Sequence, residues 1–200
     1  MRERLNLRGD SLKVEQSLFQ KTESGAIPTS PLQLELREVN NEVAARCYRK
    51  WHYLKNTGFL AHYNFGVYTD NNLWGCISFG FPNATELDGY FNRYTQNGWF
   101  EIKRLALSDS LPKNSESRVI AIGIKLLKRL EKVKGIITYA DSKVGHVGTI
   151  YKATGFIYKG LTTPKKDFYI NNKIQQRGET KNKKGEWKDR SQKHLFIKLF

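Results

Sequence analysis

Hydrophobic and polar positions alternate in several segments of this chain in the way that half-buried strands require. Residues 32–39 read Leu-Gln-Leu-Glu-Leu-Arg-Glu-Val, in which apolar and polar side chains alternate. Residues 59–68 and 73–80 are also strand-like, and Thr69-Asp70-Asn71-Asn72 between them has the composition of a hairpin turn. Further strands are predicted over 100–107, over a run that ends near Ser142, and over 194–200.

Three other segments have the 3.6-residue period of helices. The first follows Asn40 or Asn41 as its cap, and its apolar residues are Val43, Cys47, Trp51 and Leu54. The second runs to about Lys132, and its buried stripe is Val119, Ile122, Leu126, Leu130 and Val133. A third, short helix is predicted over 148–156. The order β-α-β-β-β-α-β-α-β-β predicts an α/β fold with a mixed central sheet and helices on both faces.

The chain length of 200 residues predicts one domain with a sizeable core. Residues 1–30 are polar and are expected to form a flexible arm, so the folded domain is expected over residues 31–200. Residues 81–98 read as a long loop, and loops of that length in a compact domain are usually functional or disordered.

The charge of the chain points to a polyanionic partner. Lys and Arg number 34 against 19 Asp and Glu, a net charge of +15, which favours nucleic acid or an anionic membrane surface. No apolar run approaches the roughly 20 residues of a membrane span, and no signal-peptide core follows Met1, so we expect no membrane partner. Cys47 and Cys76 lie in unrelated segments, which argues against a disulfide framework or a cysteine zinc site and favours a reduced, cytoplasmic protein.

Positive charge is concentrated in the basic segment 164–200, which has 11 Lys and Arg against 4 Asp and Glu. Residues 178–185 lack periodicity and predict a mobile loop. The basic segment is either a solvated hairpin tip or a nucleic-acid contact surface. The second alternative rests on Phe168, Tyr169 and Trp187, which are interleaved with its charges.

Residues 99–160 predict a strand, a polar loop, a helix, a strand and a second helix. Backbone N–H groups at the start of the long helix can hold an anion, and the cofactor-binding candidates there are Asn114, Ser115, Ser117 and Arg118. Ser115 and Ser117 are either N-caps of that helix or hydroxyls that face the substrate. Asp141 follows a neighbouring strand, at the edge where open α/β sheets keep their ligands.

The segment Ile150-Tyr151-Lys152-Ala153-Thr154-Gly155-Phe156 resembles the Tyr-x-x-x-Gly-Phe helix of the GNAT acyltransferase superfamily. A narrower resemblance, to the Mom family of phage proteins that modify adenine in DNA, covers roughly residues 40–162. It is carried by residues 104–107, 111–118, 140–142 and 148–151, and Trp51-His52-Tyr53 and Phe65-Gly66-Val67-Tyr68 fit the same family.

The resemblance implies a GNAT-like catalytic domain that converts the exocyclic N6 of adenine in double-stranded DNA to a carbamoylmethyl (methylcarbamoyl) form. The expected outcome is protection of phage DNA from host restriction, inside the bacterial cytoplasm. Adenine N6 is a poor nucleophile because its lone pair is delocalised into the ring, so a base and a positioned electrophile are required. Since N6 is stacked in a duplex, base flipping is also expected, with residues 81–98 or the basic segment as the wedge.

The resemblance gives each catalytic candidate a role, and an ordinary structural role stands beside it. Asp141 grips or deprotonates N6, or it caps the following turn. His52 with Tyr53 acts as base or orients the base, or His52 is only a partner of the helix dipole. Tyr151 donates a proton to a leaving thiol, or it packs a helix on the sheet. Arg104 binds a phosphate or carboxyl group, or it is an ordinary strand residue. Ser117, through its hydroxyl, is also a catalytic candidate.

The donor and any metal stay open at this point. Residues 112–118 contain no glycine, and Glu116 adds negative charge, so the loop departs from the glycine-rich pyrophosphate loop that GNAT enzymes use for acetyl-CoA. An aminoacyl-tRNA is the alternative donor, and the high positive charge suits it. Iron held by His52, Tyr53, Asp141 and Tyr151 is a further possibility, although no local spacing of metal ligands supports it.

Two other functions compete with DNA modification. One is N-acylation of another acceptor, such as an RNA base, a protein lysine or a small amine. The other is a nucleic-acid-binding module without catalysis. The oligomeric state and the sequence context of the target do not follow from the sequence.

Overall fold

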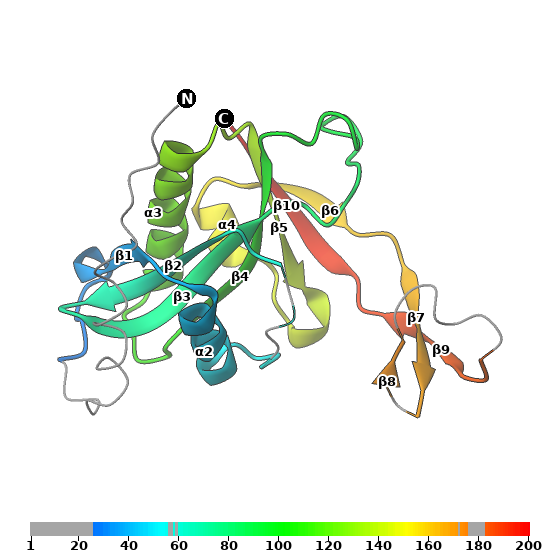
Figure 1. The fold of residues 1–200 in the computed structure, drawn as a ribbon, viewed down its shortest axis with the longest axis horizontal. Coiled ribbons are helices and arrows are strands. Elements are labelled where there is room, and N and C mark those ends of the chain that lie inside the picture. Colours follow the sequence, from blue (N-terminus) through cyan, green and yellow to red (C-terminus); the bar gives the residue numbers. More distant parts are fainter. Residues whose placement is uncertain (1–25, 56–57, 59, 172, 176–182) are drawn as a thin grey trace. The chain divides into compact units, whose positions relative to one another are not determined.

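The computed structural model describes residues 26–55, 58, 60–171, 173–175 and 183–200 (Figure 1). Its internal contacts divide the chain into two compact units. Unit 1 comprises the residues up to Phe81 together with Ile102–Lys132, and unit 2 comprises Pro82–Glu101 and Val133–Phe200. Strand β4 (Trp99–Leu107) begins in unit 2 and continues in unit 1. Most of the predicted arm, residues 1–25, lies outside the described residues.

The strands of unit 1 follow the order β1-β2-β3-β4. They are β1 (Glu35–Glu38), β2 (Tyr63–Thr69), β3 (Asn72–Gly80) and the second part of β4, and the pairs β1/β2 and β2/β3 are antiparallel. The predicted hairpin turn is confirmed, because Asp70 and Asn71 have φ of 50° and 75°, a left-handed backbone that these two residue types tolerate. The strand predicted over 32–39 is shorter, since Pro31–Gln33 forms the 3-10 helix η1.

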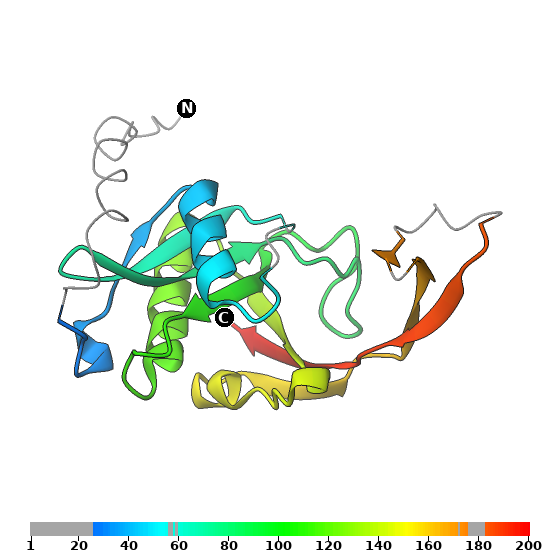
Figure 2. The same ribbon diagram turned by 90° about the horizontal axis from the view of Figure 1, so that it is seen from below.

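Helices α2 (Asn41–Trp51) and α3 (Ser115–Leu130) cover opposite faces of this sheet (Figure 2). Successive side chains of β3 point to opposite faces. Cys76 packs in one cluster with Cys47 of α2, whereas a Cβ on Gly123 of α3 would lie 3.3 Å from Ile77. The predicted placement of helices on both faces is therefore confirmed for unit 1. Across the described residues, no helix is both long and apolar enough to cross a membrane.

A buried chain of hydrogen bonds joins α2 to β2 and β3. The Tyr48 hydroxyl lies 2.6 Å from Ser78 Oγ, and Ser78 Oγ donates to Asn64 Oδ1. Because Ser78 uses its proton for Asn64, the Tyr48 hydroxyl is the donor to Ser78. Asn64 Nδ2 then donates to Asn41 Oδ1 at 2.8 Å, at the start of α2. We call these four residues the buried polar chain.

The strands of unit 2 follow the order β4-β5-β10-β6. They are the first part of β4, β5 (Gly135–Asp141), β10 (Lys193–Leu199) and β6 (Ile157–Leu161). Trp99–Glu101 pair in parallel with Gly135–Ile137, whereas β10 is antiparallel to both β5 and β6. The sheet is therefore mixed, as predicted.

The two faces of β10 pack on different partners. Ile197 belongs to a core cluster with Ile137, Trp99 and Phe91, and Phe91 belongs to the long loop 82–98. Phe196 points to the other face, where its ring lies 5.4 Å from that of Tyr151 in helix α4 (Thr149–Ala153). Loop 82–98 contains no helix or strand and only the isolated bridge between Leu87 and Phe91, so the long loop is confirmed.

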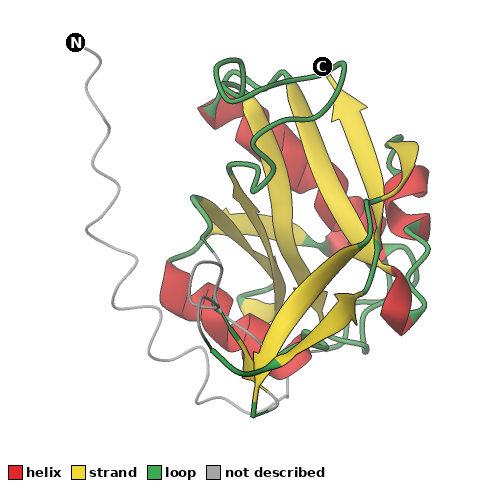
Figure 3. Cartoon of the chain, turned by 90° about the vertical axis from the view of Figure 1, so that its right-hand side faces the viewer, coloured by secondary structure: helices red, strands yellow, loops and turns green. Residues whose placement is uncertain are grey.

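The basic segment forms a second sheet, which the sequence pattern did not predict (Figure 3). Its strand order is β8-β7-β9, with β7 (Lys165–Ile170), β8 (Lys173–Ile174) and β9 (Glu186–Arg190), and both pairings are antiparallel. We call it the small sheet. The prediction of two strands after the last helix is therefore wrong, because alternating charged residues hide the strand period. Of the predicted mobile loop, residues 178–182 lie outside the described residues.

Candidate active site

His52 and Tyr53 meet at the end of helix α2. The backbone N–H of His52 closes the helix on the Tyr48 carbonyl at 3.1 Å, and the His52 side chain is 7% exposed. Its ring stacks on that of Tyr53, with centroids 4.5 Å apart and planes 26° apart. Tyr53 itself is exposed. The structure therefore brings this predicted pair together, with a buried imidazole behind a phenol that solvent can reach.

The hydrogen bonding of His52 favours one of its two predicted roles. His52 Nδ1 accepts the backbone N–H of Leu54 at 3.2 Å. A neutral imidazole that accepts at Nδ1 carries its proton on Nε2, which is then a donor. In this state His52 orients or donates to a neighbour and does not accept a proton, so the geometry supports an orienting role better than that of a base.

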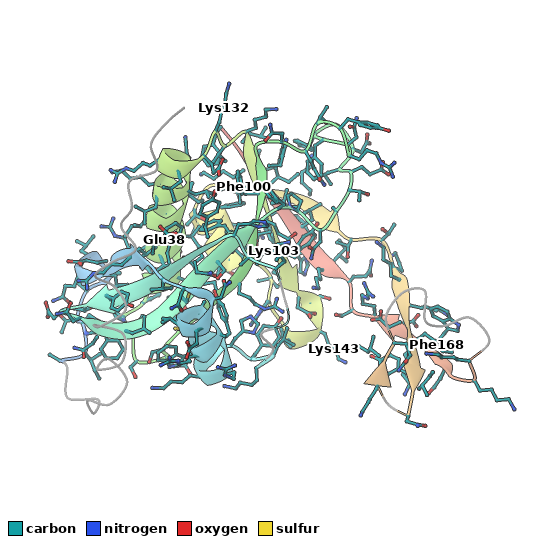
Figure 4. All side chains as sticks on the ribbon, in the orientation of Figure 1. Glu38, Phe100, Lys103, Lys132, Lys143 and Phe168 are labelled. Atoms are coloured by element: carbon teal, nitrogen blue, oxygen red, sulfur yellow. The ribbon has the colours of Figure 1, made fainter. Side chains whose placement is uncertain are left out.

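Strand β4 supplies Arg104 and a buried cation that the sequence analysis missed. Arg104 is partly buried, and its Nη1 donates to the Lys103 carbonyl at 3.2 Å. Lys103 is buried (Figure 4), and its stem packs over Gly80, where an added Cβ would lie 3.0 Å from Lys103 Cε. Burying an ammonium group is costly, so Lys103 joins the candidates. The available signal was a set of three charged residues, Glu101, Lys103 and Arg104, in a strand whose other residues are apolar.

The start of α3 differs from the prediction. The N-cap is Asn114, with φ of 71° and no side-chain capping bond, and Ser115 is the first helical residue. Ser115 Oγ donates instead to the Pro112 carbonyl at 2.6 Å. The alternative that Ser115 or Ser117 is the N-cap is therefore wrong, because the left-handed turn at Asn114 starts the helix one residue earlier.

This helix start suits an anion even though its loop lacks glycine. Asn114 takes the left-handed conformation for which glycine is the usual residue, and Asn is among the few other residues that tolerate it. Within the described part of the chain, the amides of Glu116 and Ser117 have no hydrogen-bond acceptor. Ser117 is half-buried and Arg118 is exposed. The residues present therefore fit a phosphate group, with the Glu116 carboxylate as the one opposing charge.

In unit 2, Asp141 caps the turn that follows β5. Its Oδ1 accepts the Lys143 N–H at 3.0 Å, at the start of the 3-10 helix η2 (Ser142–Val144). Its backbone carbonyl accepts the His146 N–H at 3.2 Å. The described residues offer no hydrogen-bond partner to Oδ2. The capping alternative is thus confirmed, and it leaves one carboxylate oxygen for a substrate.

Tyr151 is packed in an aromatic cluster. Its ring lies 5.8 Å from that of Phe156 and 5.4 Å from that of Phe196. Gly155 has φ of 76°, which turns the chain so that the Phe156 N–H donates to the Tyr151 carbonyl at 3.0 Å. This turn explains the Tyr-x-x-x-Gly-Phe spacing. The geometry demonstrates the packing role, while the proposed proton donation stays a prediction.

Glu101 is a buried carboxylate of unit 2 that the sequence analysis also missed. It is 7% exposed, and its Oε2 accepts the backbone N–H of Asn83 at 2.9 Å, at the start of loop 82–98. Burial, and to a lesser extent the negative charge of Glu101, raises the pKa of Tyr139 to about 12. Glu101 therefore fixes the root of the loop, and its negative charge adds to the effect of burial on the pKa of Tyr139.

Loop 82–98 contains a cavity of about 550 Å³. The lining residues are Glu86, Leu87, Asp88, Gly89, Tyr90, Phe91, Asn92 and Thr95. Lys159 Nζ lies 5.2 Å from the centre of the Tyr90 ring, beside this loop. The predicted use of the loop as a wedge for base flipping stays a prediction.

The predicted residues thus form two groups, one in each unit. Unit 1 holds His52, Tyr53, Arg104 and residues 114–118, and unit 2 holds Asp141 and Tyr151. Over the ranges that the structure describes, no three His, Cys, Asp or Glu side chains gather as metal ligands. The proposed iron ligands are two residues in each unit.

A sequence model of the Mom protein family matches residues 33–198 of this chain. Among curated proteins, the methylcarbamoylase Mom of Escherichia phage Mu is 26% identical over 130 residues, which cover 64% of this chain and 54% of the relative. The match therefore spans about half the length of that relative.

Solved acetyltransferase structures share the fold. The aminoglycoside acetyltransferase AAC(6')-Ib with ribostamycin and coenzyme A has a TM-score of 0.53 and 14% identity, over 84% of this chain and 93% of its own. An acetyltransferase from Bacillus subtilis in complex with coenzyme A has a TM-score of 0.51 and 12% identity, over 84% and 98%. These likenesses confirm the predicted GNAT-like α/β fold.

Proposed function

The chain belongs to the Mom protein family, and from this premise we propose that it modifies adenine in double-stranded DNA, turning the exocyclic N6 into a carbamoylmethyl amine. The observation that carries the proposal is the extent of the family match, since residues 33–198 include every predicted site residue. The net charge of +15 supports a polyanionic substrate. The proposed consequence is resistance of phage DNA to host restriction enzymes.

In the proposed reaction, Asp141 receives the proton that N6 loses. N6 has to give up one proton as it forms its new bond to carbon, and a carboxylate within hydrogen-bond reach both orients the amine and accepts that proton. Oδ1 of Asp141 is held by the Lys143 N–H, so Oδ2 is the oxygen assigned to N6. Arg104 and the His52–Tyr53 pair are assigned to orienting the substrate.

The start of α3 is the proposed site for the phosphates of the donor. The amides of Glu116 and Ser117 and the Arg118 side chain would hold a pyrophosphate, and Asn114 provides the left-handed turn there. Coenzyme A, when bound, would supply an acyl thioester, and attack by N6 at its carbonyl carbon would release the thiol and give an N6-acyl amine, which fits the competing acyltransferase function. An aminoacyl-tRNA is the alternative donor, because the terminal phosphates of an RNA would meet the same amides. Attack of N6 on a glycyl ester would release the tRNA 3′-hydroxyl and give an N6-glycyl adenine, which is isomeric with the carbamoylmethyl product and would reach it only by a rearrangement that moves the methylene carbon onto N6.

Nucleoside mass spectrometry of plasmid DNA from cells that express the protein tests this function. We expect a deoxyadenosine product whose mass corresponds to one carbamoylmethyl group. An N6-glycyl product would be isomeric, so fragmentation of the base has to distinguish the two. Unmodified adenine in the presence of folded wild-type protein would refute the proposal. Modified RNA, protein lysine or small amines would support acylation of another acceptor instead.

Asp141→Asn tests the proton acceptor specifically. Asparagine keeps an oxygen for the Lys143 N–H, so η2 stays capped, while the basic carboxylate is lost. We expect modification to fall by roughly 100-fold or more, the usual contribution of a positioned base. Asp109→Asn, at an exposed loop position, is the matched control and leaves modification unchanged.

A further inference from the structure

The small sheet presents an exposed indole that packs against a buried aromatic ring. Phe168 and Trp187 lie directly opposite each other on β7 and β9, with ring centroids 5.1 Å apart. Phe168, which is labelled in Figure 4, is 7% exposed. It packs over Gly185, where a Cβ would lie 2.5 Å from its ring. Trp187 is 58% exposed. The indole is therefore supported by a buried ring on one side while the rest of it faces solvent, an arrangement that suits stacking on a partner.

The charges of the small sheet leave lysines free for a polyanion. Each carboxylate has a cationic partner: Asp167 binds Arg190, Glu186 lies 3.1 Å from Lys188, and Asp189 lies 3.9 Å from Lys166. Four further lysines have no carboxylate within ion-pair distance among the described residues, and they are Lys165, Lys173, Lys183 and Lys184. All four are exposed. The acidic residues are thus engaged, and the surplus charge is positive.

The distribution of apolar groups argues against a membrane as the partner. Trp187 lies opposite Phe168, whereas the exposed Ile174 lies opposite Tyr169, so the two side chains project from opposite faces of the sheet. Insertion into a lipid interface requires apolar side chains gathered on one face. The indole of Trp187, surrounded by lysines, suits a partner that offers both phosphates and bases on which the ring can stack, which is a nucleic acid.

We propose that the small sheet is a docking surface for duplex DNA, in which the four surplus lysines contact phosphates and Trp187 stacks on a base displaced from the helix. The choice of DNA rests on the proposed function. Phosphate contacts supply affinity without sequence information. Stacking on the indole requires that a base leave the duplex, and a mispaired base costs less free energy to displace than a paired one. Trp187 therefore adds a preference for duplexes that contain a mispaired base.

Fluorescence anisotropy with a labelled DNA duplex tests the charge part of this proposal. Lys173 lies opposite Ile170 and so shares the face of Trp187, and Lys184 lies just before β9. Two phosphate contacts are expected to be lost in Lys173→Ala/Lys184→Ala, which lowers the slope of log affinity against log salt by roughly 1.8. Lys125→Ala/Arg129→Ala removes the same charge from exposed positions of α3 and is expected to leave the slope unchanged. Equal slopes for the two double variants would overturn the docking surface.

The indole is tested by Trp187→Ala with Trp187→Phe as the conservative partner. Loss of one stacked base is expected to weaken binding to a duplex with a mispaired adenine by between about fivefold and 150-fold. Trp187→Phe keeps a ring and retains most of the affinity, and unchanged melting temperatures verify that both variants fold. Tighter binding to single-stranded RNA than to the duplex, or binding to anionic vesicles that depends on Trp187, would contradict the proposal.

Mass spectrometry on the same variants separates this inference from the proposed function. If wild-type protein modifies adenine while all variants bind the duplex as wild type does, the docking surface is wrong and the function stands. If the small-sheet variants lose duplex binding but wild-type protein leaves adenine unmodified, the surface stands and the function is wrong.

Discussion

The buried polar chain of unit 1 and the small sheet of unit 2 use polar side chains in contrasting ways. Tyr48 and Ser78 are fully buried, and the Ser78 hydroxyl both accepts from Tyr48 and donates to Asn64. In the small sheet the Lys166–Asp189 and Lys188–Glu186 pairs are exposed, and solvent screens them, whereas Asp167 is partly buried beside Arg190. A buried polar group without its partner is costly, whereas an exposed charge without its partner is simply hydrated. The first arrangement therefore determines stability, and the second leaves side chains available to a ligand.

The largest expected effect comes from breaking the buried polar chain. Ser78→Ala removes the hydroxyl that accepts from Tyr48 and donates to Asn64 Oδ1, and the Tyr48 hydroxyl then keeps only weaker contacts such as that with the Cys76 thiol. With a cost of about 1–3 kcal/mol for an unsatisfied buried acceptor at Asn64, added to the weakened bonding of Tyr48, we expect the free energy of unfolding to fall by about 2–3 kcal/mol. Urea unfolding measures it, with Ser110→Ala at an exposed position as the control. A loss no larger than that of the control would show that water replaces the missing partner.

An intermediate effect is expected at alkaline pH. The pKa of Tyr139 is raised to about 12 and that of Cys76 to about 11, in both cases mainly by burial. Unfolded chains lose these protons near the ordinary values of 10 and 9, so the unfolded state binds fewer protons there and stability falls as pH rises. Between pH 10 and pH 12, the free energy of unfolding should therefore decline less in Tyr139→Phe than in the wild type, by up to about 2 kcal/mol. Urea unfolding at a series of pH values measures this difference. Identical alkaline unfolding curves for variant and wild type would contradict this assignment.

The smallest effect on stability is expected in the small sheet. Asp189→Asn breaks the exposed pair with Lys166 and should change the free energy of unfolding by less than about 0.5 kcal/mol. The same change frees one lysine, so the salt slope of duplex binding should steepen by roughly 0.9. Thermal unfolding and anisotropy on one preparation measure both quantities. A large loss of stability with an unaltered salt slope would contradict the comparison, because the small sheet would then contribute to stability and not to DNA binding.

The parts of the fold that follow a strong local pattern could be predicted from the sequence. Val43 and Cys47 indicate the buried face of α2, and Asp70-Asn71 indicates the hairpin turn. The small sheet could not be predicted in this way, because Lys-Lys-Asp and Trp-Lys-Asp-Arg have no apolar alternation. Its register depends on the contact of Phe168 with Trp187, which lies 19 residues away along the chain.

For the candidate site, the sequence yields a set of candidate residues, whose roles stay predictions, but not their geometry. Asp141 could be identified from its place after a strand, yet the oxygen that stays available is known only from its bond to Lys143. Glu101 and Lys103 were missed because a strand pattern does not reveal that charged side chains become buried. The start of α3 was misplaced because Ser and Glu have strong capping preferences, while the conformation of Asn114 decides the turn.

The left-handed Asn114 has a consequence for how related proteins are recognised. A search pattern that demands glycines before the long helix would pass over this chain, although its backbone makes the required turn. The criterion that the physics supports is broader: a residue that tolerates positive φ, followed by two uncapped amides. Aligned chains with Asn, Asp or Gly at this place would then count as equivalent, and those with a β-branched residue there would be the true departures.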